Sequence, residues 1–231
     1  MIADNLHAVR TRITQACTAA GRPVDAVQLL AVSKTFGPDS VQQAFDAGQR
    51  AFGENYIQEA VEKITALATL PIEWHCIGPI QSNKTRLVAE HFQWAHTVDR
   101  LKIAQRLSEQ RPAHLPPLQV CVQVNVDGGA TKSGVLPAEA LALARAVAAL
   151  PRLQLRGLMC IPEPAPDFVA ACAVFKRARG LFDALNADGL GLDTLSMGMS
   201  ADLDAAVASG STMVRVGTAI FGGRAYPAAS A

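Results

Sequence analysis

The segment QLLAVSKTF, residues 28–36, shows the unit from which the fold is built: a short apolar run ends in Lys34 and is followed by the helical segment PDSVQQAFDAG (38–48). Seven further apolar runs follow, each separated from the next by a segment with helical spacing or composition. Short strands that alternate with helices favour parallel β/α units, because parallel neighbours need a crossover connection and helices then cover the sheet. The eight expected strands are residues 28–33, 50–53, 73–78, 94–98, 118–126, 153–159, 193–198 and 213–217.

These strands predict a closed (β/α)8 barrel. They begin about 26 residues apart on average, and such a barrel needs roughly 200 to 250 residues, which suits a chain of 231. An amphipathic helix precedes the first strand, with apolar residues every three or four positions from Ile2 to Cys17. The competing topology, an open doubly wound sheet, usually has a glycine-rich turn after its first strand, and here that turn is SKTFGPDS. We expect one α/β domain, residues 1–231, built as a TIM barrel with an extra N-terminal helix.

The composition excludes several classes of partner. Half of the residues are hydrophobic and the formal net charge is +1, whereas a nucleic-acid surface shows a strong basic excess and a disordered chain a low hydrophobicity. There is no apolar signal segment and no window of about 18 uninterrupted apolar residues, so we expect no membrane span. Five scattered cysteines without the CxxC spacing of a metal site are typical of buried thiols in a reducing compartment. These features predict a cytoplasmic protein without a nucleic-acid partner. We expect a monomer, because the sequence shows no large apolar surface segment.

Lys34 is the first candidate functional residue, because the C-terminal ends of the strands form the functional face of a barrel. An amine held against apolar walls loses hydration, which favours the neutral form that condenses with an aldehyde. A solvated lysine at a strand end is the ordinary alternative. The Schiff-base interpretation therefore needs support from elsewhere in the chain.

That support comes from SMGMSAD (196–202) and RVGTAIFG (215–222). Ser200 is expected to cap a helix in the first segment, and Gly217 and Thr218 to begin a turn or short helix in the second. Exposed amides at a helix N-terminus bind phosphate, and barrels frequently build that site after strands seven and eight. Ordinary capping and turn chemistry would also explain these residues. Together with Lys34, they predict a barrel that holds a phosphorylated aldehyde, and pyridoxal 5′-phosphate (PLP) fits that description.

Six motifs carry a resemblance to a known family: AVSKTF (31–36), FGENYIQE (52–59), WHCIGPIQSNK (74–84), GLMCIPEP (157–164), SMGMSAD and RVGTAIFG. In this order, and over nearly the whole chain, they closely resemble the pyridoxal phosphate homeostasis proteins. The resemblance implies a barrel like the N-terminal domain of alanine racemase, a type III PLP fold. It also implies a role in intracellular PLP and vitamin B6 homeostasis, with PLP held on Lys34 as a Schiff base. Ser200, Gly217 and Thr218 would hold the phosphate, and Arg215 would face the pyridine nitrogen.

An arginine opposite the ring nitrogen has a mechanistic consequence. Because arginine is effectively always charged, it disfavours a protonated ring, and such a ring stabilises carbanions less well. This suits a carrier with little or no catalysis, which could supply PLP-dependent apo-enzymes.

A PLP-dependent amino-acid racemase is the alternative function. Two-base racemisation needs a partner across the ring from Lys34, and neither Tyr56 nor Tyr226 lies where one is expected. In alanine racemases a C-terminal β domain supplies that tyrosine, and here such a domain would have to follow residue 231. A Schiff-base aldolase is a third class, but no other strand offers the acid and base neighbours that it needs. The sequence therefore favours the carrier.

Several further residues have more than one interpretation. Asn55 either contacts the cofactor or caps the next helix. His75 is expected to be a hydrogen-bonded interior histidine, and Met197 and Met199 to pack near the ring. Lys132 is expected to be solvated, with a second amine for PLP as the alternative.

Overall fold

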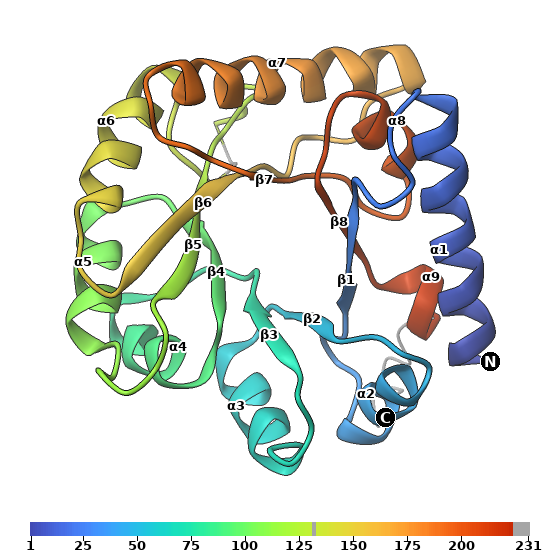
Figure 1. Ribbon diagram of the computed structural model, residues 1–231, viewed down its shortest axis with the longest axis horizontal. Helices are drawn as coiled ribbons and strands as arrows, with labels where there is room; N and C mark the ends of the chain where they lie inside the picture. The colour runs from blue at the N-terminus through green and yellow to red at the C-terminus, as the bar shows by residue number, and fades with distance from the viewer. Residues whose placement is uncertain (131–132, 224–231) are drawn as a thin grey trace, which may run out of the picture.

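Eight parallel strands form a closed barrel in the computed structural model, which describes residues 1–130 and 133–223. The strands follow one another around the barrel in sequence order, and β1 closes it by pairing with both β2 and β8 (Figure 1). Their bounds are β1 (Gln28–Val32), β2 (Ala51–Glu54), β3 (Glu73–Cys76), β4 (Trp94–Val98), β5 (Leu118–Gln123), β6 (Leu153–Met159), β7 (Thr194–Ser196) and β8 (Met213–Val216). The predicted (β/α)8 barrel is confirmed. The residues Lys132 and Tyr226 lie outside the described part of the chain.

Helices cover the outside of the barrel between successive strands (Figure 1). Proline at the first helical turn, which needs no amide donor, begins two of them, and the Asp167 side chain caps a third by accepting from Ala170 N (2.8 Å). The helices are α2 (Pro38–Asp46), α3 (Ile57–Ala66), α4 (Thr85–His91), α5 (Leu101–Gln110), α6 (Pro137–Ala148), α7 (Phe168–Ala187), α8 (Leu203–Ala208) and α9 (Thr218–Phe221), with a 3-10 turn, Ser82–Lys84, before α4.

The fifth strand is shorter than its apolar run predicts. The run continues to Val126, but β5 ends at Gln123. Val124 N still donates to Met159 O of β6 (2.9 Å), but beyond it the backbone pairs with the following loop: Asn125 N donates to Val135 O (2.9 Å), and Val135 N donates to Gln123 O (3.0 Å). The predicted bounds 118–126 were therefore wrong at their C-terminal end, because apolar composition does not distinguish a barrel strand from a buried loop that follows it.

Alternate residues of the strands pack on opposite faces of the barrel wall. In β1, Leu29 and Ala31 belong to the main cluster shared with the surrounding helices, whereas Leu30 and Val32 pack with Ala51, Ile77 and Met213 in a separate cluster. This alternation is the period-two pattern of a strand that is buried on both sides. The polar side chains of His75, His96, Ser196 and Arg215 are also buried, and they share the barrel with the apolar groups.

The helix α1 (Ile2–Ala19) confirms the predicted N-terminal helix and packs beside α8 and α9 (Figure 1). Its Asn5 Nδ2 donates to Ile220 O (2.9 Å) in α9. Its Arg12 Nη1 donates to Ser200 O (2.7 Å), and Arg12 also pairs with Asp204 in α8. These contacts hold the loop after β7 and the helices α8 and α9, so the extra helix supports the part of the functional face that β7 and β8 build.

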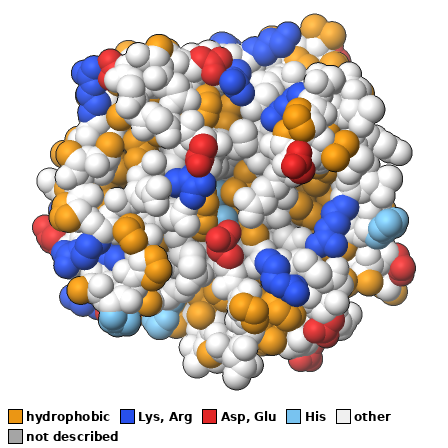
Figure 2. Space-filling view, in the orientation of Figure 1, with side chains coloured by type: hydrophobic (Ala, Val, Ile, Leu, Met, Phe, Trp, Pro, Cys, Tyr) orange, Lys and Arg blue, Asp and Glu red, His pale blue; other side chains and the backbone are white. Residues whose placement is uncertain are grey.

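The surface in view has charges of both signs around its centre, without a patch of a single sign (Figure 2). This intermixing fits the net charge of +1. Among the described residues, no helix is both long and apolar enough to cross a membrane.

Candidate functional site

A cavity of about 380 Å³ lies at the C-terminal ends of the strands. All six residues that the sequence nominates line it: Lys34, Asn55, Ser200, Arg215, Gly217 and Thr218. They follow or belong to four different strand regions, and closure of the barrel brings them together. The volume falls within the range of roughly 300 to 1,000 Å³ typical of small-molecule sites. We call this space the C-terminal cavity.

The backbone around Lys34 is held by a buried ion pair on the neighbouring unit. Lys63 Nζ, in α3, donates to Glu54 Oε1 (2.7 Å), Ser33 O (3.0 Å) and Glu59 Oε1 (3.1 Å). Ser33 Oγ also donates to Glu54 Oε1 (2.5 Å), and Thr35 N donates to Glu59 Oε1 (2.9 Å). The residues on both sides of Lys34 are thus bonded to one network, which fixes where its side chain begins.

Two features of this network cost free energy. Burial raises the pKa of Glu54, although the adjacent Lys63 ammonium opposes that change. Thr35 has φ of +67°, a left-handed conformation that a β-branched residue rarely adopts. Such backbone strain is typical of functional sites and persists only where surrounding contacts enforce it. Here the bond from Thr35 N to Glu59 is one of those contacts.

Arg215 is a buried cation that projects from β8 to the C-terminal cavity. Only 4% of the residue is exposed, so the interpretation as an outward-facing arginine does not apply. Its Nη1 donates to Ser196 Oγ (2.8 Å) and its Nη2 donates to Cys160 O (3.0 Å). Burial lowers the pKa of Arg215 from its usual value, but a guanidinium keeps its proton in proteins. The cavity therefore has a fixed positive group on its β8 side.

Ser200, Gly217 and Thr218 lie on the loops after β7 and β8. The prediction that Ser200 caps a helix is wrong: α8 begins at Leu203 with Asp202 as its N-cap residue. Asp202 Oδ1 instead accepts from Met199 N (2.6 Å), so a turn before the helix places Ser200 at the cavity. The second expectation is confirmed, because Gly217 is the N-cap residue of α9 and Thr218 its first residue. A Cβ on Gly217 would lie 3.0 Å from Val32 O, so a glycine lets this loop approach β1.

Asn55 lines the cavity and does not cap the following helix. The N-cap residue of α3 is Tyr56, and no side chain completes that cap. Within the described chain, the buried Asn55 Oδ1 has no hydrogen-bond partner. A buried amide oxygen without a partner is costly, so a ligand that donates to it would be stabilised here.

Sequence reasoning missed the remaining walls of the cavity. These are mainly apolar residues at or shortly after the ends of strands: Val32, Phe36, Ile77 and Ile161, together with Ala201 and Gly222. Phe36 also stacks on Phe221 of α9, with ring centroids 5.2 Å apart. Their position after a strand was a usable signal, but apolar residues at strand ends are too common to be noticed alone.

The other nominated residues lie in the barrel or at its rim. His75 is fully buried and bonded to His96 and Glu73, so the interior-histidine interpretation is confirmed. Met197 is buried in the core, whereas Met199 lines the C-terminal cavity. All five cysteines are buried and free, as predicted, and burial raises the pKa of three of these thiols to about 12: Cys76, Cys121 and Cys160.

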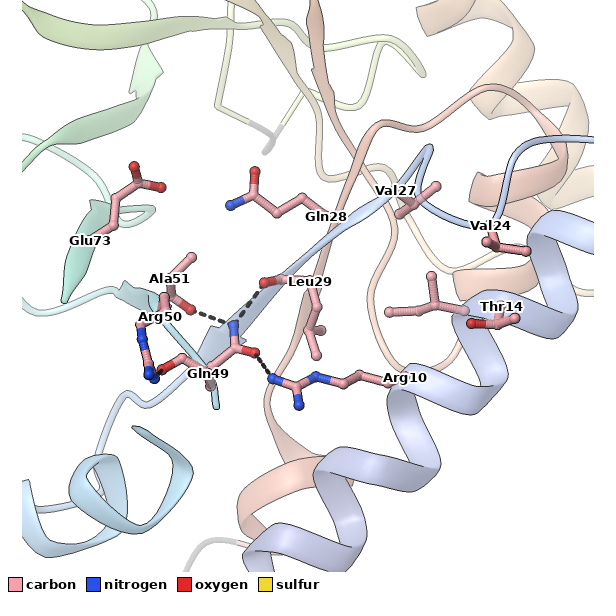
Figure 3. Close-up of a pocket in the computed structure, with 11 residues that line it drawn as sticks. Arg10, Thr14, Val24, Val27, Gln28, Leu29, Gln49, Arg50, Ala51 and Glu73 are labelled. Atoms are coloured by element: carbon pink, nitrogen blue, oxygen red, sulfur yellow. Dashed lines mark hydrogen bonds between the residues drawn. The ribbon is translucent and has the colours of Figure 1, made fainter. Parts of the chain in front are cut away.

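A second cavity, the N-terminal groove, lies at the opposite ends of the strands and contains none of the six nominated residues (Figure 3). Its volume is about 480 Å³, and its lining includes Arg10, Gln28, Gln49, Arg50 and Glu73. Gln49 holds this region together: its Nε2 donates to Leu29 O and Ala51 O (both 2.8 Å), and its Oε1 accepts from Arg10 (3.1 Å). Barrel enzymes keep their chemistry at the other face, so the larger cavity is not the primary candidate.

The fold and the C-terminal cavity together define a barrel of the alanine racemase N-terminal domain class. The family described as "Alanine racemase, N-terminal domain" matches residues 5–225. The chain is 62% identical over 227 residues to the "Pyridoxal phosphate homeostasis protein" of Pseudomonas aeruginosa, covering 98% of this chain and 97% of the relative. It is 54% identical to the protein of the same name from Escherichia coli, covering 97% of each. The chain therefore belongs to the pyridoxal phosphate homeostasis protein family.

Solved structures agree with this assignment. PipY of Synechococcus elongatus, in a structure described as having PLP bound, is 38% identical with a TM-score of 0.84, covering 96% of this chain and 100% of PipY. An alanine racemase of Clostridium difficile has a TM-score of 0.73 at 16% identity, covering 96% of this chain and 58% of the racemase. This second likeness supports the barrel fold alone.

Proposed function

We propose that this protein binds PLP in the C-terminal cavity, holds it as a Schiff base on Lys34, and serves intracellular PLP homeostasis with little or no catalysis of its own. The names of the relatives and the PLP-bound PipY support the ligand. The observation that carries the proposal for this chain is the meeting of Lys34 and Arg215, from opposite ends of the sequence, in one cavity.

The chemistry of the cavity fits PLP. Its two charged lining residues in the described chain, Lys34 and Arg215, are cations, which suits an anionic phosphate ester. Asn55 Oδ1 offers a buried acceptor without a partner, and Phe36, Ile77 and Ile161 offer apolar walls for a flat ring. Ligand sites commonly combine such apolar walls with a few placed polar groups.

Each nominated residue has a distinct role in the proposal. PLP supplies an aldehyde, and the Lys34 amine is the group that would attack it with loss of water. Ser200 and Thr218 would donate hydroxyl hydrogen bonds to the phosphate, while Gly217 leaves its backbone accessible. Asn55 would contact the ring substituents through its amide. Arg215 would face the ring nitrogen and keep it unprotonated, because a fixed guanidinium opposes a second positive charge beside it.

The same lining argues for a carrier over a racemase. Racemisation needs an acid and a base on opposite faces of the bound amino acid. Among the described lining residues, Lys34 is the one side chain suited to proton transfer. Tyr56 is 51% exposed and lies outside the lining, and Tyr226 belongs to the part of the chain that is not described. An amino-acid racemase is therefore the less supported function.

The proposal extends to the setting in which the protein works. We infer one domain over residues 1–231, a monomer, and a cytoplasmic location, which suits five buried free thiols. PLP-dependent apo-enzymes would be the recipients of the cofactor. Release of PLP to such an apo-enzyme, followed through the activity that it gains, is the direct measurement of this role.

Borohydride trapping tests the site. The protein loaded with PLP should be yellow, and reduction followed by peptide mapping should find the adduct on the peptide that contains Lys34. Lys34→Ala should reduce the adduct to background, whereas Lys102→Ala, at an exposed position on α5, should leave it unchanged. An adduct confined to another lysine, such as Lys132, would contradict the assignment. Inversion of L- or D-alanine by the loaded protein would favour the racemase instead.

A further inference from the structure

A continuous hydrogen-bonded chain runs through the barrel interior from the C-terminal cavity to the N-terminal groove. Arg215 Nη1 contacts Ser196 Oγ (2.8 Å), and Ser196 Oγ contacts His96 Nδ1 (2.9 Å). His96 Nε2 contacts His75 Nδ1 (2.8 Å), and His75 Nε2 contacts Glu73 Oε1 (2.8 Å). The members come from β8, β7, β4 and β3. Glu73 lines the N-terminal groove (Figure 3) and Arg215 lines the C-terminal cavity. The chain therefore joins the two ends of the barrel.

The chemistry of the two ends fixes the direction of every hydrogen bond between them. A guanidinium can only donate, so Ser196 must accept from Arg215. An ionised carboxylate can only accept, so His75 must donate from Nε2 to Glu73. The hydrogen bond from His75 is the main reason why the pKa of Glu73 is lowered, which keeps this carboxylate ionised at neutral pH. The end groups therefore give the chain a donor end at Arg215 and an acceptor end at Glu73.

The tautomers of both histidines follow from this direction. Because His75 donates from Nε2, its neutral ring must accept at Nδ1, and His96 must supply that hydrogen from its own Nε2. His96 then accepts at Nδ1 from the hydroxyl of Ser196. Every member has a donor or acceptor where its neighbour needs one. The reverse direction would require a protonated Glu73 and would leave the Ser196 hydroxyl hydrogen without a partner among the bonds that the described residues provide.

The surroundings keep both imidazoles neutral, which this pattern requires. Burial lowers the pKa of His75 and lowers that of His96 well below its usual value, and the adjacent Arg215 and His75 act on His96 in the same direction. The Trp94 ring stacks on His75 with centroids 5.0 Å apart, and the Arg156 guanidinium lies 4.7 Å from the Trp94 ring centroid. Glu73 is the one group of this set that favours a charged His75.

We propose that Glu73, His75 and His96 are positioning residues for Arg215. The ionised Glu73 selects one tautomer in each histidine. In its selected tautomer, His96 accepts a hydrogen bond from the Ser196 hydroxyl, and Ser196 Oγ is then oriented to accept a hydrogen bond from the guanidinium. Arg215 is thereby held in one orientation at the C-terminal cavity by a residue at the opposite end of the barrel. The effect on PLP rests on the proposed function, whereas the direction of the chain and the position of Arg215 do not.

Nitrogen-15 NMR of the PLP-free protein tests the direction of the chain. At pH 7 both His75 and His96 should carry hydrogen on Nε2 and an unprotonated Nδ1. An Nδ1–H tautomer or a doubly protonated ring at either residue would overturn the proposal. This readout requires neither PLP nor any activity.

The substitution Glu73→Gln tests the positioning role. A carboxamide can donate as well as accept, so it no longer selects a tautomer. We expect His75 and His96 to lose their single Nε2–H form and the side-chain signals of Arg215 to shift, all without PLP. The dissociation constant for PLP should rise on the order of tenfold, comparable with the loss of outer-shell partners at metal sites. Glu90→Gln is the matched control, because the Glu73 and Glu90 side chains are both 38% exposed and Glu90 pairs with Arg86 on the surface of α4.

The outcomes separate this proposal from the proposed function. If the Arg215 signals and the PLP retention of Glu73→Gln equal those of Glu90→Gln, the positioning role is wrong. This holds even if His75 and His96 of the wild-type protein show the expected tautomers. If the wild-type protein takes up no PLP, the proposed function fails. The tautomers and the Arg215 signals of the PLP-free protein then decide the positioning role alone. A Glu73→Gln protein that melts like wild type but shows the shifted Arg215 signals supports it.

Discussion

A single backbone contact controls the position of Asn55 at the cavity. Gly78 follows β3, and a Cβ built on it would lie 2.0 Å from Asn55 O and 2.7 Å from Asn55 Cα. No rotamer change relieves such an overlap, because both atoms belong to the backbone. Gly78 is also held from the other side, since its carbonyl accepts from Thr97 Oγ1 (2.7 Å). The absence of a side chain at Gly78 is therefore a condition for the present position of Asn55.

We predict that Gly78→Ala displaces Asn55 and weakens PLP retention. Overpacking of this kind costs about 1 to 3 kcal/mol of unfolding free energy. The control is Gly180→Ala in α7, where an added Cβ meets nothing within 4 Å and the helix should gain up to about 1 kcal/mol. Denaturant unfolding and absorbance titration with PLP measure the two effects. Wild-type stability and PLP affinity in Gly78→Ala would contradict the argument.

At the scale of elements, the buried pair of Lys63 and Glu54 joins α3 to β2 and to the end of β1. Both residues are almost completely buried, with exposed fractions of 3% and 1%. A lysine inside the helical pattern NYIQEAVEKITAL has no sequence signal for burial, because lysine usually lies on the solvated face. The helix was predictable from its periodicity. The pairing of Lys63 with Glu54, nine residues earlier on β2, was not, because it depends on how α3 packs against the barrel.

We predict that Lys63→Met lowers the free energy of unfolding by about 3 to 5 kcal/mol, because it leaves Glu54 buried without its cationic partner. The double variant Lys63→Met with Glu54→Leu should recover a substantial part of that loss. Arg86→Met is the comparison, since the exposed pair of Arg86 and Glu90 should contribute about 1 kcal/mol or less. Urea unfolding of the four proteins, including wild type, is the measurement. Equal losses in Lys63→Met and Arg86→Met would show that the buried pair does not support α3.

For the whole molecule, the order of strands and helices along the sequence was enough to predict the barrel and the place of its functional site. Alternating runs implied the closed barrel, and closure places the ends of β1 and β8 side by side, so Lys34 and Arg215 could be expected in one place. Side-chain roles that depend on one turn could not be settled: Ser200 looked like a cap, and Asn55 had two equal interpretations.

The interior chain was missed for a different reason. His96 lies within the run WAHTV, which reads as a plain apolar strand. His96 meets Ser196 across 100 residues of sequence, and that pairing depends on strand register and on which face each residue occupies. The alternation in EWHC and WAHTV could have placed both histidines on the inner face, but no local pattern gives their partners.

The pH dependence of stability tests the buried histidines in the intact barrel. Burial lowers the pKa values of His75 and His96 in the folded protein, whereas histidine in an unfolded chain titrates near 6.5. Above about pH 6.5 neither state protonates these rings, so their contribution to stability is fully present. As the pH falls below that value, the unfolded chain binds protons that the folded protein does not, and the free energy of unfolding decreases. Each histidine can contribute a slope of up to about 1.4 kcal/mol per pH unit.

We predict that His96→Gln reduces the loss of stability between pH 7 and pH 5, because one of the two buried titrating rings is removed. The variant should be less stable than wild type at pH 7, since it breaks the interior chain, but its slope with pH should be shallower by up to about 1.4 kcal/mol per unit. Urea unfolding followed by the fluorescence of the buried Trp74 and Trp94 gives both quantities. His114→Gln, the same substitution at an exposed position, should keep the wild-type slope. A His96→Gln slope equal to that of wild type would mean that His96 takes up a proton in the folded barrel, which the donor pattern from Arg215 to Glu73 does not allow.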